Sequence, residues 1–380
     1  MRFAVVAAMA VAAATASVPT YDGYTYDMFL AEHRPAMLLT GEKPCPARKA
    51  VFEANLATIK AHNAQGRSWF MKVNEHADMT EEEFLAFYTG LDKSSRNQAR
   101  LTTTRAATRI HNDFAISFKA RRQYEDVSAL PVSADWSSTI KTALNQGQCG
   151  SCWAFAAAHT FIGRANIASG KDVSVSAQQI TSCTPNPRKC GGSGGCQGAT
   201  FQLAADYITK EGFLTTAEAY PYTSGSTGST GSCKLDASMP RALTIGGYTE
   251  LPKNNKTALL AEVAKGGPVS VSVAASKWFL YGGGVFDGCT SSKDGIVNHA
   301  VTMTGYQLEG TPYVSILNSW GKSWGENGYI RLKMYDSEPV TSDTSPHSGA
   351  ACADEPSVPY DVVGECGVFS DSAFPEDVKA

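Results

Sequence analysis

The stretch that decides the fold runs from Gln146 to Phe155 and reads Gln-Gly-Gln-Cys-Gly-Ser-Cys-Trp-Ala-Phe. A glycine-rich turn over residues 147–151 gives way at Cys152 to an apolar run that continues through Ile162 without a polar face. A run of this kind predicts a helix that is buried in the core. The sulfur of Cys152 then lies at the positive end of the helix dipole, which favours the nucleophilic thiolate. The stretch therefore predicts both a central helix and a reactive cysteine.

Composition narrows the class of protein. The chain has 380 residues, enough for a globular body plus additional segments, and a formal charge of −3. That charge provides no basic field of the kind that nucleic-acid binding needs, so no nucleic-acid partner is expected. Ten cysteines are many for a cytosolic protein, and their spacing fits no zinc site. We expect disulfides formed in an oxidising compartment, with neither a metal nor a cofactor.

The N-terminus agrees with that compartment. Arg2 precedes an apolar Ala/Val run from Phe3 to Ala14, and Ala14-Thr15-Ala16 has the small residues of a signal-peptidase site. A buried N-terminal helix is the alternative, but the run has no amphipathic period. Residues 1–16 are therefore predicted to be a cleaved secretory signal, with a lysosome-like vacuole or the cell exterior as destination. No later stretch has the length of a membrane span.

Three further segments follow the predicted signal. Residues 17–92 have a helical pattern, in which Thr80 and Glu83 have the spacing of a capping box. Residues 93–112 are dominated by Ser, Thr, Ala and Arg and cannot order themselves by burial, so residues 93–128 are predicted to be a cleavable linker and propeptide tail. Residues 129–380 form the main body.

The main body changes character along its length. The central helix, a Gly/Cys-rich loop, a helix over residues 201–210 and a flexible loop over residues 223–232 come first. Beyond residue 246, short alternating strands predominate, and residues 337–359 form a polar insertion at the surface. We expect an α+β fold with two lobes and a cleft between them, because ligand sites favour such junctions.

A catalytic thiol needs a histidine that takes its proton and later protonates the leaving amine. Of the seven histidines, His299 fits best, because it leads a strand of the β-rich half and can face Cys152 across the cleft. His159 lies on the helix of the thiol, about 10 Å along it, and is expected to be structural. Asn318 follows a second strand and can orient the imidazole. Gln146 can join the backbone N–H of Cys152 in an oxyanion hole.

These residues stand in a longer set of motifs. The set comprises Cys149-Gly150-Ser151-Cys152-Trp153, His299, Asn318-Ser319-Trp320-Gly321 and Trp324-Gly325-Glu326-Asn327-Gly328-Tyr329. It resembles the papain family of cysteine proteases, of the cathepsin L type, over about residues 51–375. The resemblance implies a papain-like two-lobe fold in which Cys152 is the nucleophile and His299 the general acid/base. It also implies that Asn318 orients His299, that Gln146 is an oxyanion donor, and that Trp320 shields the His–Asn hydrogen bond.

The helical segment resembles the inhibitory propeptide of that family, which implies a zymogen. Matches to its two motifs occur at Arg48, Phe52, Asn55, Ile59, Asn63, Asn74, Ala77 and Asp78. Two positions depart from the pattern, since Pro44 stands where a glutamate is expected and His76 replaces a phenylalanine. Acid is expected to protonate Asp78 and His76, to loosen the propeptide, and so to allow maturation near residues 126–130.

The resemblance also implies three disulfides, namely Cys149–Cys196, Cys183–Cys233 and Cys289–Cys366. Because Cys152 must stay reduced and Cys45 lies in the propeptide, Cys190 and Cys352 remain. We predict that these two form a fourth disulfide, which holds the insertion near the cleft; two free thiols are the alternative.

Substrate-binding residues follow from the same resemblance. The family's Asn-Gly-Gly appears as Gln197-Gly198-Ala199, whose backbone is expected to pair with an extended substrate. The residues implied to line the S2 pocket, together with an acid at its base, are Thr200, Phe201, Ser272, Val297, Ala300 and Asp371. An acid at that place favours Arg or Lys at P2 in addition to Phe and Leu.

The sequence thus predicts a secreted or vacuolar endopeptidase, a monomer that acts on polypeptides and is inhibited by its own propeptide. Cystatin-type inhibitors are further expected partners. An exopeptidase of the same family, an inactive peptide-binding homologue and a disulfide-stapled structural protein are the alternatives. Asn255-Lys256-Thr257 is a glycosylation sequon.

Overall fold

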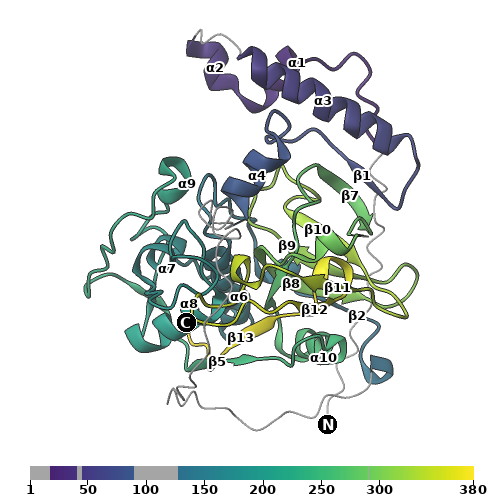
Figure 1. The fold of residues 1–380 in the computed structure, drawn as a ribbon. Helices are drawn as coiled ribbons and strands as arrows, with labels where there is room; N and C mark the ends of the chain where they lie inside the picture. Colours follow the sequence, from purple (N-terminus) through teal and green to yellow (C-terminus); the bar gives the residue numbers. More distant parts are fainter. Residues whose placement is uncertain (1–17, 41–44, 90–126, 290) are drawn as a thin grey trace.

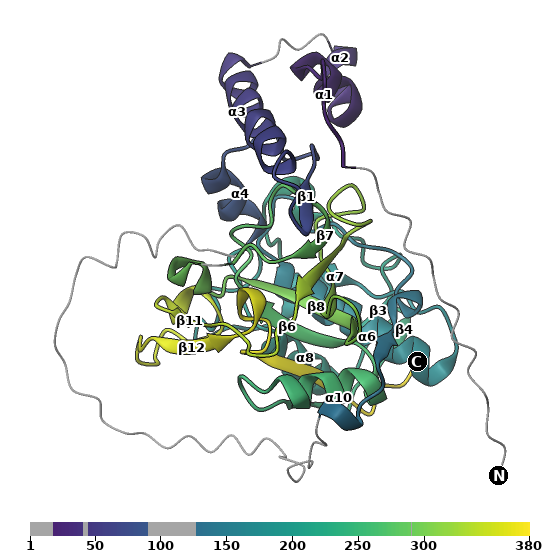
Figure 2. The ribbon, with the colours of Figure 1, turned by 90° about the vertical axis from the view of Figure 1, so that its right-hand side faces the viewer.

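The computed structural model describes residues 18–40, 45–89, 127–289 and 291–380 (Figure 1). The predicted signal, residues 1–16, and most of the predicted linker lie outside the described residues. The described chain forms a helical lobe, a β-rich lobe and a small N-terminal module that stands at one end of the molecule (Figure 2). The predicted α+β class is confirmed.

The N-terminal module packs around the apolar face of its longest helix, where Phe52, Leu56 and Ile59 are buried. The predicted capping box is present, because the side chains of Thr80 and Glu83 each accept a hydrogen bond from the other's backbone N–H. The elements of the module are α1 (Tyr26–His33), α2 (Pro35–Thr40), α3 (Pro46–Asn63), β1 (Trp69–Met71) and α4 (Glu81–Tyr88).

The helical lobe is built around α6, which begins at Cys152 as predicted. Every residue of α6 from Cys152 to Ala165 is buried, so the helix packs on all sides. The elements of this lobe are α6 (Cys152–Ser169), α7 (Ala177–Cys183), α8 (Phe201–Glu211), β3 (Leu214–Thr215), α9 (Ser224–Thr227) and β4 (Arg241–Leu243).

The β-rich lobe is a sheet with the order β1-β7-β10-β9-β8-β6-β13-β5, and β2 pairs with β8. Among the described strands of this sheet, β7 and β10 pair in parallel and the other pairs are antiparallel. The strands are β2 (Ser133–Asp135), β5 (Gly247–Glu250), β6 (Val269–Val273), β7 (Tyr281–Phe286), β8 (His299–Gln307), β9 (Tyr313–Leu317), β10 (Tyr329–Lys333) and β13 (Ser372–Glu376). Helix α10 (Lys256–Gly266) covers this lobe at its edge (Figure 1).

Insertion 337–359 departs from β10 and returns toward β13. It contains β11 (Val340–Asp343), which pairs antiparallel with β12 (Tyr360–Val363), in a separate two-stranded sheet. The short 3-10 helices of the fold are η1 (Val127–Ala129), η2 (Ser137–Thr139), η3 (Ser292–Gly295), η4 (Pro346–Ser348) and η5 (Glu365–Gly367).

Three elements differ from the sequence-based expectation. Strand β1 lies in a module that was predicted to be helical, because its partner β7 is about 210 residues away and no local pattern reveals it. Helix α10 interrupts a region predicted to contain strands; Asn255 caps it by accepting from the N–H of Ala258 at 2.9 Å. Part of the predicted flexible loop forms the single turn α9.

Candidate active site

Cys152 and His299 come from different lobes and line the same pocket. Cys152 is the first residue of α6, and His299 is the first residue of β8. Both side chains are buried. The structure thus brings together the two groups that the sequence assigned to a nucleophile and its base.

Asn318 fixes the tautomer of His299. Oδ1 of Asn318 accepts from the backbone N–H of Ser319 at 2.8 Å, which identifies this atom as the amide oxygen. The same oxygen lies 2.8 Å from Nε2 of His299. Because an amide oxygen can only accept, Nε2 carries the proton and Nδ1 is left with its lone pair. Nδ1 is buried and has no protein partner among the described residues, so it is ready to accept a proton in the pocket.

Burial sets the resting charge state of the pair. It raises the pKa of the Cys152 thiol to about 11, against which backbone hydrogen bonds act only partly. It lowers the pKa of His299 to about 4, although the hydrogen bond that Nε2 donates to Asn318 acts in the opposite direction. In the described form the pair therefore rests as a neutral thiol beside a neutral imidazole. His159, also buried and with a pKa of about 3, accepts from the N–H of Leu144 and stays apart from the pair.

Gln146 is held at both ends of its amide. Its Oε1 accepts from Oγ of Ser319 at 2.7 Å, and its Nε2 donates to the carbonyl of Cys149 at 2.9 Å. The second acceptor of Nε2 is the carbonyl of Tyr88 at 3.3 Å. Tyr88 belongs to the N-terminal module, so this module occupies the amide that was predicted to bind the oxyanion.

Trp320 covers the imidazole and also contacts the N-terminal module. Its ring stacks on His299 with centroids 4.8 Å apart, which shields the bond to Asn318 from water. Its Nε1 donates to the same carbonyl of Tyr88 at 3.1 Å. One carbonyl oxygen of the N-terminal module thus accepts from two side chains at the active site.

The N-terminal module is docked by further contacts with the β-rich lobe. Strand β1 extends the sheet by pairing with β7. Nδ2 of Asn74 donates to the carbonyl of Phe279, and Nζ of Lys72 donates to that of Gly325, both at 2.8 Å. These contacts hold the module against the β-rich lobe.

The pocket beside Cys152 contains most of the predicted substrate-binding residues. Those that line it are Gly198, Ala199, Thr200, Phe201, Ser272, Val297 and Ala300. Asp371 stands behind this surface, where its carboxylate accepts from Oγ of Ser272 at 2.6 Å and from Nε2 of Gln202 at 3.3 Å. Trp320 lies over His299 rather than in the pocket.

Five lining residues were not predicted: Gly191, Asn298, Ser348, Gly349 and Ala350. Asn298 could have been found as the neighbour of His299. The other four carry no catalytic pattern, and their only signal was the pair of cysteines that flank them in the sequence, Cys190 and Cys352.

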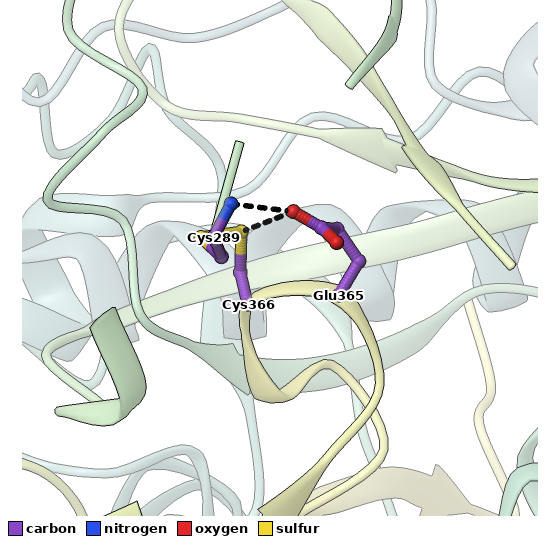
Figure 3. A group of neighbouring side chains, drawn as sticks. All are labelled: Cys289, Glu365 and Cys366. Atoms are coloured by element: carbon purple, nitrogen blue, oxygen red, sulfur yellow. Dashed lines mark hydrogen bonds between the residues drawn. A yellow bond between two sulfur atoms is a disulfide. The ribbon is translucent and has the colours of Figure 1, made fainter. Parts of the chain in front are cut away.

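The four predicted disulfides are formed in the structure. They are Cys149–Cys196, Cys183–Cys233, Cys190–Cys352 and Cys289–Cys366. Cys152 and Cys45 are free. Figure 3 shows the last disulfide beside Glu365, whose carboxylate accepts from the N–H of Cys289 at 2.7 Å. This trio does not suit a metal, because its two sulfur atoms are bonded to each other and offer no thiolate.

Comparison with protein families agrees with the site. The model of the papain family cysteine proteases matches residues 130–348, and that of the cathepsin propeptide inhibitor domain (I29) matches residues 46–84. The chain belongs to the papain family of cysteine proteases. It is made as a proenzyme, in which the N-terminal module is the inhibitory propeptide.

Individual relatives extend over most of the chain. Cysteine protease XCP2 of Arabidopsis thaliana is 35% identical over 298 residues, which are 77% of this chain and 76% of the relative. KDEL-tailed cysteine endopeptidase CEP2 of Arabidopsis thaliana is 33% identical over 320 residues, 83% of this chain and 81% of the relative.

Solved proenzymes share the fold. The recombinant stem bromelain precursor has a TM-score of 0.66 and 28% identity, with 92% of this chain and 98% of that chain covered. Digestive procathepsin L 3 of the Tenebrio molitor larval midgut has a TM-score of 0.65 and 26% identity, with 92% and 99% covered. The predicted papain-like fold with its propeptide is confirmed. In the described part of the chain, no helix is both long and apolar enough to cross a membrane.

Proposed function

We propose that the mature protein is a cysteine endopeptidase that cleaves polypeptides through an acyl-enzyme on Cys152. The observation that carries this proposal is the bare Nδ1 of His299, which shares a pocket with the thiol while Asn318 holds Nε2. An imidazole that is fixed in this tautomer can accept the thiol proton on Nδ1.

The steps follow from these positions. His299 takes the proton of Cys152, and the sulfur attacks the substrate carbonyl. The carbonyl oxygen becomes an oxyanion, which accepts from the N–H of Cys152 and from Nε2 of Gln146 once the carbonyl of Tyr88 has left. The imidazolium then protonates the leaving amine, and the acyl-enzyme remains. A water molecule, deprotonated by His299, hydrolyses the thioester and releases the acid.

Substrate recognition is proposed to use the backbone of Ala199 and the adjacent pocket. Neither the N–H nor the C=O of Ala199 takes part in a backbone hydrogen bond within the described chain, so both can pair with an extended peptide. The pocket is lined by apolar and small residues and suits a hydrophobic P2 side chain. Ser272 lies between Asp371 and the pocket, so Asp371 would attract a basic P2 residue across that side chain. The variant Asp371→Ala tests this role. If the ratio of kcat/KM for Arg at P2 to that for Leu at P2 is unchanged, the role is rejected.

Endopeptidase activity is favoured over exopeptidase activity by the relative that is named an endopeptidase. We propose the predicted organisation for the whole chain: a signal at 1–16, a propeptide at 17–92, a linker at 93–128 and a peptidase at 129–380. Maturation near residues 126–130 would yield a monomer that works in the secretory pathway, in a vacuole or outside the cell. Cystatin-type inhibitors would bind its cleft.

The decisive experiment uses a fluorogenic peptide that is blocked at both ends, together with an epoxysuccinyl inhibitor. The matured protein is expected to cleave the peptide internally, and the inhibitor should label Cys152. Cys152→Ser and His299→Ala should lose activity, whereas the matched control Cys45→Ser, which changes the free thiol of the propeptide, should retain it. Cleavage only of peptides with a free terminus would support an exopeptidase, and labelling without cleavage would support an inactive homologue.

A further inference from the structure

One wall of the substrate pocket comes from the insertion. We call residues 344–355 the strap; it follows β11 and contains η4. Ser348, Gly349 and Ala350 of the strap line the pocket together with Cys152 and His299. The strap is therefore part of the surface that a substrate side chain would meet.

The strap fits between the two lobes with its backbone in direct contact. A Cβ atom built on Gly349 would lie 2.6 Å from the carbonyl oxygen of Val297, on the side of the β-rich lobe. A Cβ atom built on Gly191, on the side of the helical lobe, would lie 2.7 Å from the carbonyl oxygen of Gly349. At both contacts the backbones approach more closely than any side chain would allow, so the strap spans the cleft from one wall to the other.

Three attachments hold the strap in this place. At its start, the carboxylate of Asp343 accepts from the N–H of Ser345 at 2.7 Å and from that of Val297 at 3.2 Å. At its far end, the Cys190–Cys352 disulfide ties it to the helical lobe. Beside that disulfide, the N–H of Gly191 donates to the carbonyl of Ala351 at 3.1 Å.

The far end has an additional surface anchor. The guanidinium of Arg188 makes two hydrogen bonds of 3.0 Å with the carboxylate of Asp354. Both side chains are about half exposed, so this pair adds less to the attachment than the disulfide does.

The strap narrows the pocket from this side, because residues 348–350 stand against the same space as Ser272 and Ala300 of the β-rich lobe and Phe201 on α8. A longer P2 side chain reaches further toward this wall than a short one. The side chain of valine adds three carbon atoms beyond Cα, whereas that of phenylalanine adds seven. A wall with contacts on both sides cannot move aside for the larger group without losing them.

We propose that the strap is a specificity determinant, and that it restricts the P2 residue of the substrate to short apolar side chains such as valine, alanine and proline. This inference rests on the proposed function and narrows its substrate class. The disulfide and the backbone contacts make the restriction a fixed feature of the cleft.

The first test compares the matured wild-type enzyme on blocked substrates that differ only at P2. We expect kcat/KM for valine to exceed that for phenylalanine by at least about tenfold, the size of discrimination that misfit of apolar groups gives in a rigid pocket. Equal or higher kcat/KM for phenylalanine would overturn the inference.

The second test changes the strap itself. The double variant Cys190→Ser/Cys352→Ser should raise kcat/KM for phenylalanine relative to valine by about tenfold. The matched control Cys183→Ser/Cys233→Ser removes a disulfide that borders no part of the pocket, and the ratio should stay as in the wild type. An unchanged ratio in the Cys190/Cys352 variant would also overturn the inference.

A third variant keeps the test independent of disulfide folding. Ala350→Leu adds three carbon atoms to the wall and should lower kcat/KM for valine at P2 about tenfold while that for glycine stays within about twofold. Equal losses for both substrates would contradict the placement of the strap. Active sites are counted with the epoxysuccinyl label in every case, so a labelled enzyme with the wrong P2 ratios rejects the strap alone. An unlabelled and inactive enzyme rejects the proposed function as well.

Discussion

The replacement of His76 by phenylalanine should make the propeptide less sensitive to acid. His76 is buried in the propeptide, with its ring 4.4 Å from that of Tyr88 and 5.2 Å from that of Phe84, which in turn packs on Trp320 of the enzyme. Burial lowers its pKa from 6.5 to about 3, and the positive charge of Arg34 and the neighbouring His33 act in the same direction. An acid, Glu75, lies beside it, with Oε1 3.6 Å from Nε2.

The lowered pKa of His76 makes docking of the propeptide depend on pH. Between pH 6.5 and about pH 3 the released propeptide binds a proton at His76 that the docked propeptide does not, so docking weakens as the pH falls. Between pH 7 and pH 4 the loss from this one group is about 3 kcal/mol, or about 200-fold in the docking equilibrium. Phenylalanine fills the same site and cannot bind a proton.

Hydrogen exchange of the β1 amides measures this loss without any catalysis. The parent is a proenzyme with Cys152→Ser, and the comparison protein carries His76→Phe in addition. Between pH 7 and pH 4, the free energy of opening of β1 should fall by about 3 kcal/mol more in the parent than in the comparison protein. Tyr88→Phe alters the same aromatic cluster without removing a group that titrates in this range. The free energy of opening in this variant should fall between pH 7 and pH 4 by as much as in the parent. If His76→Phe loses as much protection as the parent, the acid sensitivity comes from other groups.

Three further predictions concern the site and the stability of the fold. Ser319→Ala frees the amide of Gln146 and should lower kcat about tenfold with little change in KM, measured on the matured enzyme; a loss in KM alone would contradict a role in the transition state. Asn74→Ala removes the bond to Phe279 and should weaken propeptide docking by about 2 kcal/mol, seen as faster maturation at neutral pH with unchanged kcat/KM of the matured enzyme. Burial raises the pKa of Glu365 to about 7, so its contribution of about 3 kcal/mol is complete below pH 4.5 and is lost as the pH rises through 7; in urea unfolding, Glu365→Gln should flatten this dependence, and an equally steep profile would reject it.

The sequence was most informative where chemistry restricts the choice of residue. Cys152, His299 and Asn318 could be assigned because few residue types can serve as nucleophile, base and orienter. Each also has a recognisable place: Cys152 follows a turn, His299 begins a strand and Asn318 follows one. Helix α6 could be predicted since its apolar run has no polar face.

Some elements of the structure form only through residues far away in the chain, and the local sequence does not reveal them. The wall formed by residues 348–350 consists of a serine, a glycine and an alanine, which serve through their position alone. Strand β1 exists because β7 offers an edge, and neither Trp69 nor Phe70 reveals that by itself. The pairing of Cys190 with Cys352 was the one long-range link that counting of cysteines could supply.

The carbonyl of Tyr88, which rests on Gln146 and Trp320, has a consequence for how activation depends on dilution. While the chain is continuous, this carbonyl is a tethered ligand, and the tether raises its effective concentration at the active site above that of a free propeptide. All four disulfides join cysteines between residues 149 and 366, so cleavage of the connection leaves no covalent link to the propeptide. The same contacts then obey an ordinary dissociation constant. In a compartment where the cleaved protein is concentrated, the propeptide would stay bound and inhibit the enzyme. Release into a larger volume would dilute the propeptide, and the enzyme would become active.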